Sequence, residues 1–290
     1  MIASKPVVAG IDFSSSSAKV LRHAACTATA EGVPLLAVHV VDPARLPHRV
    51  GCRPSAVAIE AAVRSAKQQL ARLVREHAGD AVVEELVMEG HPVDEFQRLV
   101  AREQAGLLVI AAHEAPRGWA DSLARGCVRT LPCDVLLLSD RVEDEFRRVM
   151  ACVDFSPVSG TVLGRAIEAA RSRAVLDIVH VMFPPDRDLW GETLDLEAER
   201  FVEESRAETR EAMERVTREY RAALAPLVHR TCIVESAVPS VELTCRVGDT
   251  AADLVVLGTR GHSRLGAVFL DTNAERLLHD AMVSVLAVRR

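Results

Sequence analysis

Residues 7–28, VVAGIDFSSSSAKVLRHAACTA, are matched in pattern by residues 149–170, VMACVDFSPVSGTVLGRAIEAA. In both stretches an apolar run ends in Asp-Phe-Ser, and apolar residues at helical spacing follow it. Each stretch is therefore predicted to form a strand, a turn and a helix. Similarity between two distant segments indicates that the chain contains two copies of one structural unit.

Three more apolar runs recur in the same order in the two halves. The last two pairs are nearly continuous in apolar residues, as parallel strands buried on both faces are. Near the ends of the first pair stand His39 and His180, and their recurrence predicts a packing or hydrogen-bonding role rather than catalysis. The pairs are residues 35–43 with 176–184, 106–113 with 252–259, and 132–140 with 282–290.

A long helical pattern follows the second strand of each copy. One face is apolar, and in the second copy the other face carries acid-base pairs typical of a solvated surface, with a partner-binding face as the alternative. The first pattern, residues 56–78, has Val63, Leu70, Leu73 and Val74 on its apolar face; the second, residues 198–227, has Val202, Met213, Val216, Tyr220 and Leu224. Alternating strands and helices predict an open parallel sheet with helices on both faces.

The composition excludes several classes of protein. The chain has 290 residues, 49% apolar and 26% charged, which is typical of globular domains rather than disordered segments. A formal net charge of −6 without a basic concentration argues against a nucleic-acid partner. Residues 1–14 lack the apolar core of a secretory signal and no run is long enough to span a membrane, so we expect a cytoplasmic protein. We place the two domains at residues 1–143 and 144–290.

No catalytic constellation is found in the sequence. The chain lacks a G-x-S-x-G elbow, and HEAPRG at residues 113–118 lacks the second histidine of a zinc-protease helix. The serines at positions 14–17, 156 and 159 follow the Asp-Phe turns, where helix capping explains them. We expect no efficient enzyme, with slow ATP hydrolysis as the remaining catalytic alternative, and no resident metal.

Seven cysteines without C-x-x-C spacing indicate reduced thiols rather than a disulfide framework. Cys52 differs from the others because His48, Arg49 and Arg53 surround it, and nearby positive charge favours the thiolate. A redox-responsive thiol and an ordinary loop cysteine are therefore the two alternatives. The rarity of reactive thiols favours the second.

The stretch VVLGTRGHSRLGAVFLDTNAERLLHDA, residues 255–281, has the pattern of a strand, a glycine loop and a helix. Gly258 and Gly261 follow the strand, and glycine allows backbone to approach a ligand closely. Arg260 adds positive charge, and a following helix N-terminus favours anions. The loop therefore predicts an anion site, with a simple flexible turn as the structural alternative.

With these motifs, nearly the whole chain from residue 5 to 290 resembles two tandem universal stress protein domains. The resemblance implies five-stranded, Rossmann-like parallel folds and an ATP site in the second domain built around a Gly-x2-Gly-x9-Gly-Ser/Thr loop. It assigns Asp154 to the adenine side and Val181 to the second-strand contact. It also assigns Gly258 and Gly261 to the first two glycines and Thr272 to the terminal hydroxyl, with Arg260 lying between the glycines.

The pattern departs from the family at Asp271, which stands where the third glycine is expected. A carboxylate there repels phosphate, and it also stabilises a helix start as an internal anion. Thr272 and Glu275 form a capping-box pattern, so the hydroxyl has a structural role that a bound phosphate could share. A weakened ATP site is expected, with a divalent cation held beside the nucleotide by Asp271 as the less favoured alternative.

The first copy departs further. Ala111 stands in place of Gly258 and Glu114 in place of Gly261, while Asp121-Ser122 corresponds to Asp271-Thr272. Negative charge would occupy the phosphate position, so no nucleotide is expected in the first domain. Asp12 and Val40 nevertheless keep the adenine-side pattern.

Three functions remain open on this basis. The first is a non-catalytic stress-response regulator with a weak adenine-nucleotide site in the second domain. The second is an interaction module that has lost nucleotide binding, and the third is a redox-responsive protein using Cys52. In the implied fold the final strands, DVLLL at 134–138 and SVLAV at 284–288, lie at sheet edges, and apolar edges favour association. We expect the repeats to pair as an intrachain pseudo-dimer, with a homodimer and further protein partners as extensions.

Overall fold

The computed structural model describes residues 5–47, 54–112, 123–141, 145–170, 174–183, 195–259 and 283–289. The chain divides into two compact units, unit 1 from Met1 to Glu145 and unit 2 from Phe146 to Arg290. The domain boundary expected between residues 143 and 144 lies outside the described residues. How the units pair, and therefore the pseudo-dimer, stays a prediction.

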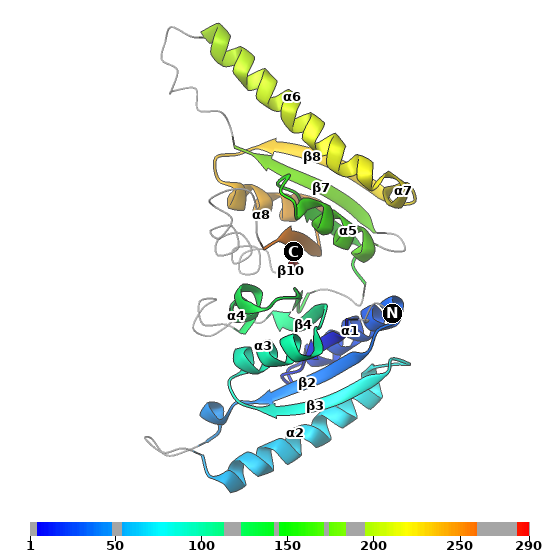
Figure 1. Cartoon of the computed structure of the whole chain (residues 1–290), viewed down its shortest axis with the longest axis vertical. Coiled ribbons are helices and arrows are strands. Elements are labelled where there is room, and N and C mark those ends of the chain that lie inside the picture. Colours follow the sequence, from blue (N-terminus) through cyan, green and yellow to red (C-terminus); the bar gives the residue numbers. More distant parts are fainter. Residues whose placement is uncertain are drawn as a thin grey trace. The chain divides into compact units, whose positions relative to one another are not determined.

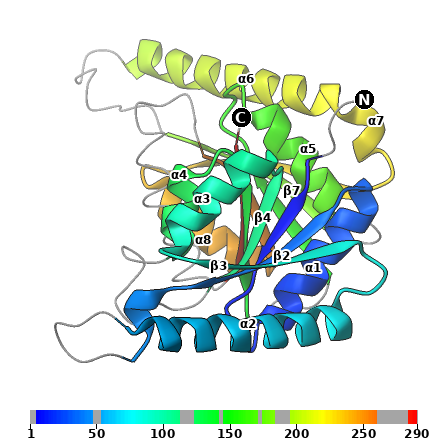
Figure 2. The ribbon, with the colours of Figure 1, turned by 60° about the horizontal axis from the view of Figure 1, so that its bottom comes forward.

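Unit 1 alternates strands and helices. Its elements are β1 (Val7–Gly10), α1 (Ser17–Glu31), β2 (Leu35–Val41), the 3-10 helix η1 (Pro43–Arg45), α2 (Ala56–His77), β3 (Val83–Glu89), α3 (Pro92–Glu103), β4 (Leu107–Ala112), α4 (Leu123–Thr130) and β5 (Asp134–Ser139). The strands are parallel in the order β3-β2-β1-β4-β5. Helices α2 and α3 lie on opposite faces of β2 and β3 (Figure 2).

Unit 2 repeats this arrangement. Its elements are β6 (Arg148–Cys152), α5 (Ser159–Ala169), β7 (Val175–Met182), α6 (Asp195–Glu219), α7 (Arg221–Leu224), β8 (Val228–Glu235), α8 (Pro239–Thr250), β9 (Leu254–Gly258) and β10 (Ser284–Val288). The strands are parallel in the order β8-β7-β6-β9-β10. Helix α6 lies alongside β8 (Figure 1).

The strand registers align the two units residue by residue. Val7 pairs with Leu35 and Leu107, just as Val149 pairs with Leu176 and Leu254. Counting along the strands makes His39 equivalent to His180, Val40 to Val181 and Ala111 to Gly258. These are the correspondences expected from the sequence repeat.

The tandem Rossmann-like α/β architecture expected from the sequence is confirmed, with two differences in detail. The sequence patterns did not locate β3 and β8, the outer strands, although the resemblance implied five strands in each domain. The single helical pattern expected over residues 198–227 is interrupted at Tyr220, which has φ −104° and ψ 11° and precedes α7. Tyr220 also packs toward Gly160 and Gly164 of α5, where a Cβ would lie 3.4 Å from the tyrosine ring or hydroxyl.

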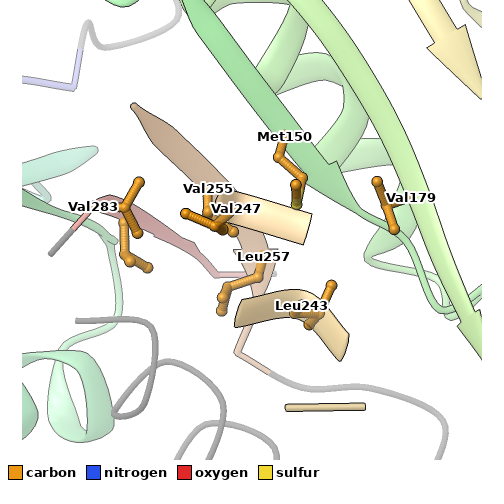
Figure 3. Close-up of a cluster of buried hydrophobic side chains, with 8 residues drawn as sticks. Met150, Val179, Leu243, Val247, Val255, Leu257 and Val283 are labelled. Carbon is orange, nitrogen blue, oxygen red and sulfur yellow. The ribbon is translucent and has the colours of Figure 1, made fainter. Parts of the chain in front are cut away.

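The cores of the two units use different side chains at equivalent places. In unit 2 a buried apolar cluster joins β6, β7, β9 and β10 to α8 (Figure 3). Leu243 of α8 in this cluster is equivalent to Phe96 of α3, since both lie four residues after the helix-starting proline. Cys152 at the end of β6 is equivalent to Gly10 of β1. The larger side chain of Phe96 in unit 1 is therefore matched with glycine, whereas the smaller side chain of Leu243 in unit 2 is matched with cysteine.

The fit at Gly10 leaves no room for a side chain. An ideal Cβ there would lie 2.6 Å from Ile110 Cγ2 and 2.9 Å from Phe96 Cζ. We expect Gly10→Cys to lower the free energy of unfolding of unit 1 by about 1–3 kcal/mol through overpacking. Adding Phe96→Leu, which reproduces the unit 2 pair, should recover part of this loss.

Urea denaturation of Gly10→Cys, Phe96→Leu and the double variant measures this coupling. Phe96→Leu alone serves as the control, because it creates space without filling it. If the double variant lost as much free energy of unfolding as the two single variants together, the side-chain volumes at positions 10 and 96 would not be coupled, contrary to this expectation.

Candidate functional site

Asp154 lies immediately after β6, where the chain turns toward α5. The Val153 N–H donates to the Val179 carbonyl of β7 at 2.9 Å, which extends the sheet to the residue before the aspartate. Asp154 Oδ1 accepts from the Ser156 N–H at 3.0 Å and from the Ser159 hydroxyl at 2.9 Å. The carboxylate is exposed, yet its orientation is fixed by its own turn and by the first residue of α5.

Unit 1 holds Asp12 in the same way. Its Oδ1 accepts from the Ser14 N–H at 3.0 Å and from the Ser17 hydroxyl at 2.9 Å. The expectation that the serines after the turn cap the helices is wrong for these contacts. The N-cap residues are Ser16 and Val158, and neither makes a side-chain capping bond, because the Ser16 hydroxyl donates to Asp140 and valine has no polar side chain. The hydroxyls of Ser17 and Ser159, the first residues of α1 and α5, donate to the aspartate.

The phenylalanine after each aspartate has a left-handed backbone. Phe13 has φ 61° and Phe155 has φ 59°, a conformation that costs a non-glycine residue about 1–2 kcal/mol. Each ring packs on a histidine of the neighbouring strand. The centroid separation is 4.3 Å for Phe13 and His39, and 4.1 Å for Phe155 and His180.

The same histidines also bond the backbone before the aspartate. His39 Nδ1 lies 2.7 Å from the Ile11 carbonyl oxygen, and His180 Nδ1 lies 2.8 Å from that of Val153. A carbonyl only accepts, so Nδ1 carries the proton and donates. The hydrogen-bonding role predicted from the recurrence of His39 and His180 is confirmed.

The pKa of His180 is lowered from its ordinary value. Burial of the imidazole is the main cause, while the bond to Val153 and the charge of Asp154 act in the opposite direction. Burial of the imidazole therefore favours the neutral form of His180, against the effect of the two groups in the turn.

Val181 and Gly258 complete the part of the predicted site that the structure describes. Val181 is half-buried on β7 and packs against the cluster of Figure 3. Gly258 ends β9, and a Cβ there would lie 3.3 Å from Val158 Cγ1 and 3.6 Å from Val162 Cγ2. The close packing of α5 is one structural reason for this glycine, and in unit 1 the smaller Ser16 takes the place of Val158 beside Ala111.

The adjacent strands β7, β6 and β9 thus bring Val181, Asp154 and Gly258 to one carboxyl edge of the sheet. The other predicted site residues, Arg260, Gly261, Asp271 and Thr272, lie outside the described residues. So do Cys52 with its basic neighbours, and Glu114 and Asp121 of the first repeat.

Thr259, which the sequence reasoning missed, lies next to Gly258. Its N–H donates to the Val288 carbonyl of β10 at 2.9 Å. Its side chain is buried, with 6% of the residue exposed, and within the described residues its hydroxyl has no hydrogen-bond partner. The equivalent residue in unit 1 is Ala112, so only unit 2 carries a hydroxyl at this point of the edge.

An exposed apolar rim also distinguishes unit 2. The Ser236 N–H donates to the Met182 carbonyl, and the exposed Phe183 and Val238 flank this bond, with Val241 in the first turn of α8. Their counterparts in unit 1 are the polar residues Asp42, His91 and Asp94. Sequence reasoning missed the rim because isolated apolar residues in a loop and a first helical turn have no periodic pattern.

Unit 1 has a polar contact at the same edge. The Ser16 hydroxyl donates to Asp140 Oδ1, and Lys19 Nζ donates to the Asp140 carbonyl at 2.7 Å. Asp140 follows β5, so this contact links the end of the last strand to the start of α1. It places a further carboxylate beside the start of α1, close to the turn that holds Asp12.

In the part of the chain that the structure describes, no helix is both long and apolar enough to cross a membrane. Nor does any group of three or more His, Cys, Asp or Glu side chains among the described residues have the arrangement of a metal site.

The lowered pKa of His180 predicts a pH dependence of stability. The unfolded chain takes up a proton on this histidine near pH 6.5, while the folded chain resists it, so the contribution of neutral His180 is complete above that pH and is lost as the pH falls. The difference in free energy of unfolding between wild type and His180→Phe should therefore shrink from about pH 7.5 to about pH 5.5. Denaturant titrations at several pH values measure it, and a difference that grows on acidification would contradict the assignment.

Comparisons with known proteins agree with the repeat. A family model described as "Universal stress protein family" matches residues 3–139 and again residues 145–289. Universal stress protein A homolog 1 of Coxiella burnetii is 31% identical over 147 residues, which cover 49% of this chain and 96% of that protein. A solved universal stress protein from Archaeoglobus fulgidus DSM 4304 is 18% identical, with a TM-score of 0.68. The match covers 99% of this chain and 97% of the chain of that protein. Another universal stress protein from Archaeoglobus fulgidus, solved in complex with dAMP, is 26% identical, with a TM-score of 0.35. This match covers 47% of this chain and 98% of the chain of that protein.

Proposed function

The chain belongs to the universal stress protein family, and we propose that it is a non-catalytic regulator whose unit 2 binds an adenine nucleotide weakly. Occupancy of this site would control contacts with protein partners. Unit 1 takes no nucleotide and serves as the structural counterpart of unit 2.

The observation that carries this proposal is the oriented carboxylate of Asp154 at a three-strand edge. Within the described residues, the hydrogen bonds to this carboxylate go to Oδ1 alone, and the side chain is exposed. Open parallel sheets bind ligands beyond the carboxyl ends of their strands, where the strand order reverses. In unit 2 the reversal falls at β6, whose neighbours β7 and β9 supply Val181 and Gly258.

Two further features of unit 2 support a ligand at this edge. The hydroxyl of Thr259, which has no partner in the described part of the chain, stands beside Gly258, and a buried polar group without a partner costs free energy that a ligand contact can recover. The exposed Phe183 and Val238 offer apolar surface suited to a flat base. Unit 1 has Ala112 and Asp42 in place of Thr259 and Phe183, and Glu114 and Asp121 in its loop add negative charge.

The affinity is expected to be low because of Asp271. This residue occupies the third-glycine position of the family loop, where its negative charge opposes a triphosphate. The absence of a nucleophile and base pattern in the sequence supports a binding role rather than efficient hydrolysis.

Calorimetric titration of ATP into the purified full chain, with and without magnesium, tests the proposal. We expect about one site per chain, tighter binding in Asp271→Gly and weaker binding in Gly258→Ala. Because a Cβ at Gly258 would press on Val158, the double variant Gly258→Ala/Val158→Ser, which copies the unit 1 pair, separates packing from ligand contact. Val158→Ser alone is the matched control, and phosphate release in the same samples reports hydrolysis.

A second candidate function is an interaction module without nucleotide. The apolar rim of Phe183, Val238 and Val241 favours it, since exposed apolar groups mark binding surfaces. Absence of ATP binding in the wild type, with binding gained in Asp271→Gly, would support this candidate over the first. Absence in both would remove the nucleotide proposal altogether.

A further inference from the structure

We propose that His180 is a positioning residue for the ligand edge of unit 2, holding Asp154 in its ligand-facing orientation through the residues on either side of it. His39 holds the turn of unit 1 by the same contacts. The part of this inference that concerns ligand affinity rests on the proposed nucleotide function, whereas the part that concerns the turn does not.

One imidazole contacts both neighbours of the aspartate. Nδ1 donates to the carbonyl of Val153, the residue before Asp154, at 2.8 Å. The ring packs at 4.1 Å on Phe155, the residue after it. The aspartate between them is thereby fixed at both of its peptide links, although its own side chain is exposed.

The turn needs such support because its backbone is strained. Phe155 has φ 59°, and a left-handed phenylalanine persists only where the surroundings favour it over relaxed alternatives. In this conformation of Phe155 the Ser156 N–H reaches Asp154 Oδ1 at 3.0 Å. If Phe155 relaxed, the Ser156 N–H would shift relative to the carboxylate, and the bond that orients Asp154 together with the Ser159 hydroxyl would weaken.

A purely apolar packing role does not account for these contacts. Packing alone would not require a ring N–H directed at a carbonyl, yet His39 and His180 make that bond at 2.7 Å and 2.8 Å. The surroundings differ between the units, since Gly10 and Ser16 in one correspond to Cys152 and Val158 in the other. The contacts of the histidine with the turn are the same in both.

Three variants separate the contributions. His180→Phe retains a ring against Phe155 but removes the donor to Val153. His180→Asn removes the ring but retains an N–H donor near the position of Nδ1. His39→Phe makes the first change in unit 1, whose turn has the same contacts but where Ala111 and the acidic loop residues exclude the nucleotide, and it is the matched control.

The first readout is NMR of the ligand-free full chain. We expect the chemical shifts of the His180 ring nitrogens to be those of the neutral Nδ1–H tautomer. We also expect a strong NOE between the amide proton and Hα of Phe155, which is the signature of positive φ. His180→Phe should weaken this NOE and broaden the Ser156 amide signal, and His180→Asn should retain most of both. The Nε2–H tautomer, or a Phe155 NOE unchanged in His180→Phe, would overturn the proposal.

The second readout is ATP affinity by the same titration. Loss of this part-buried hydrogen bond predicts binding weaker by roughly tenfold in His180→Phe, by less than about threefold in His180→Asn, and no change in His39→Phe. Equal weakening by His180→Phe and His39→Phe would mean a general loss of stability and would overturn the positioning role. A Phe155 NOE that is altered in His180→Phe while the ATP affinity is unaltered would also overturn the positioning role. If the wild type binds no ATP, the proposed function fails, and the NMR readout alone decides whether His180 holds the turn.

Discussion

The left-handed turn after the first strand is the constraint on which the rest of each unit depends. It directs an aspartate to the carboxyl edge of the sheet while the chain leaves β6 for α5, or β1 for α1. A carboxylate, a backbone N–H and a serine hydroxyl close the turn, and a histidine of the neighbouring strand holds it from the other side. Because the turn is the same in both units, the proposed difference in ligand binding must come from the residues around it.

Those surrounding residues have changed in matched sets. Gly258 with Val158 in unit 2 corresponds to Ala111 with Ser16 in unit 1, so a volume gained at one position is lost at its neighbour. A glycine at the end of β9 therefore has a packing reason that is independent of the proposed ligand, and glycine alone does not identify the site. The stronger distinction between the units is electrostatic and polar, because the Asp140 carboxylate stands at the edge of unit 1, whereas at the edge of unit 2 the Thr259 hydroxyl has no partner among the residues that the structure describes.

Much of the fold was predictable because buried parallel strands and their helices have strong patterns, and the repeat supplied each pattern twice. The outer strands β3 and β8 were not located because each is open to solvent along one edge and mixes exposed charges with half-buried residues. The bonding role of His180 followed from its recurrence, but its ring contact with Phe155 did not, since no sequence pattern reports a positive φ. The serines were assigned to helix capping because their spacing fits it, whereas the nearby aspartate competes successfully for the hydroxyl of Ser159.

In the proposed function, one edge of the chain binds an adenine nucleotide and its structural copy does not. The most direct measurement is a two-dimensional amide NMR titration of the full chain with ATP, because each signal of unit 2 has an internal control in unit 1. The account predicts saturable shifts at Ser156, Val181 and Thr259, with no comparable shifts at Ser14, Val40 and Ala112. Equal shifts at both sets, or none at either, would contradict it.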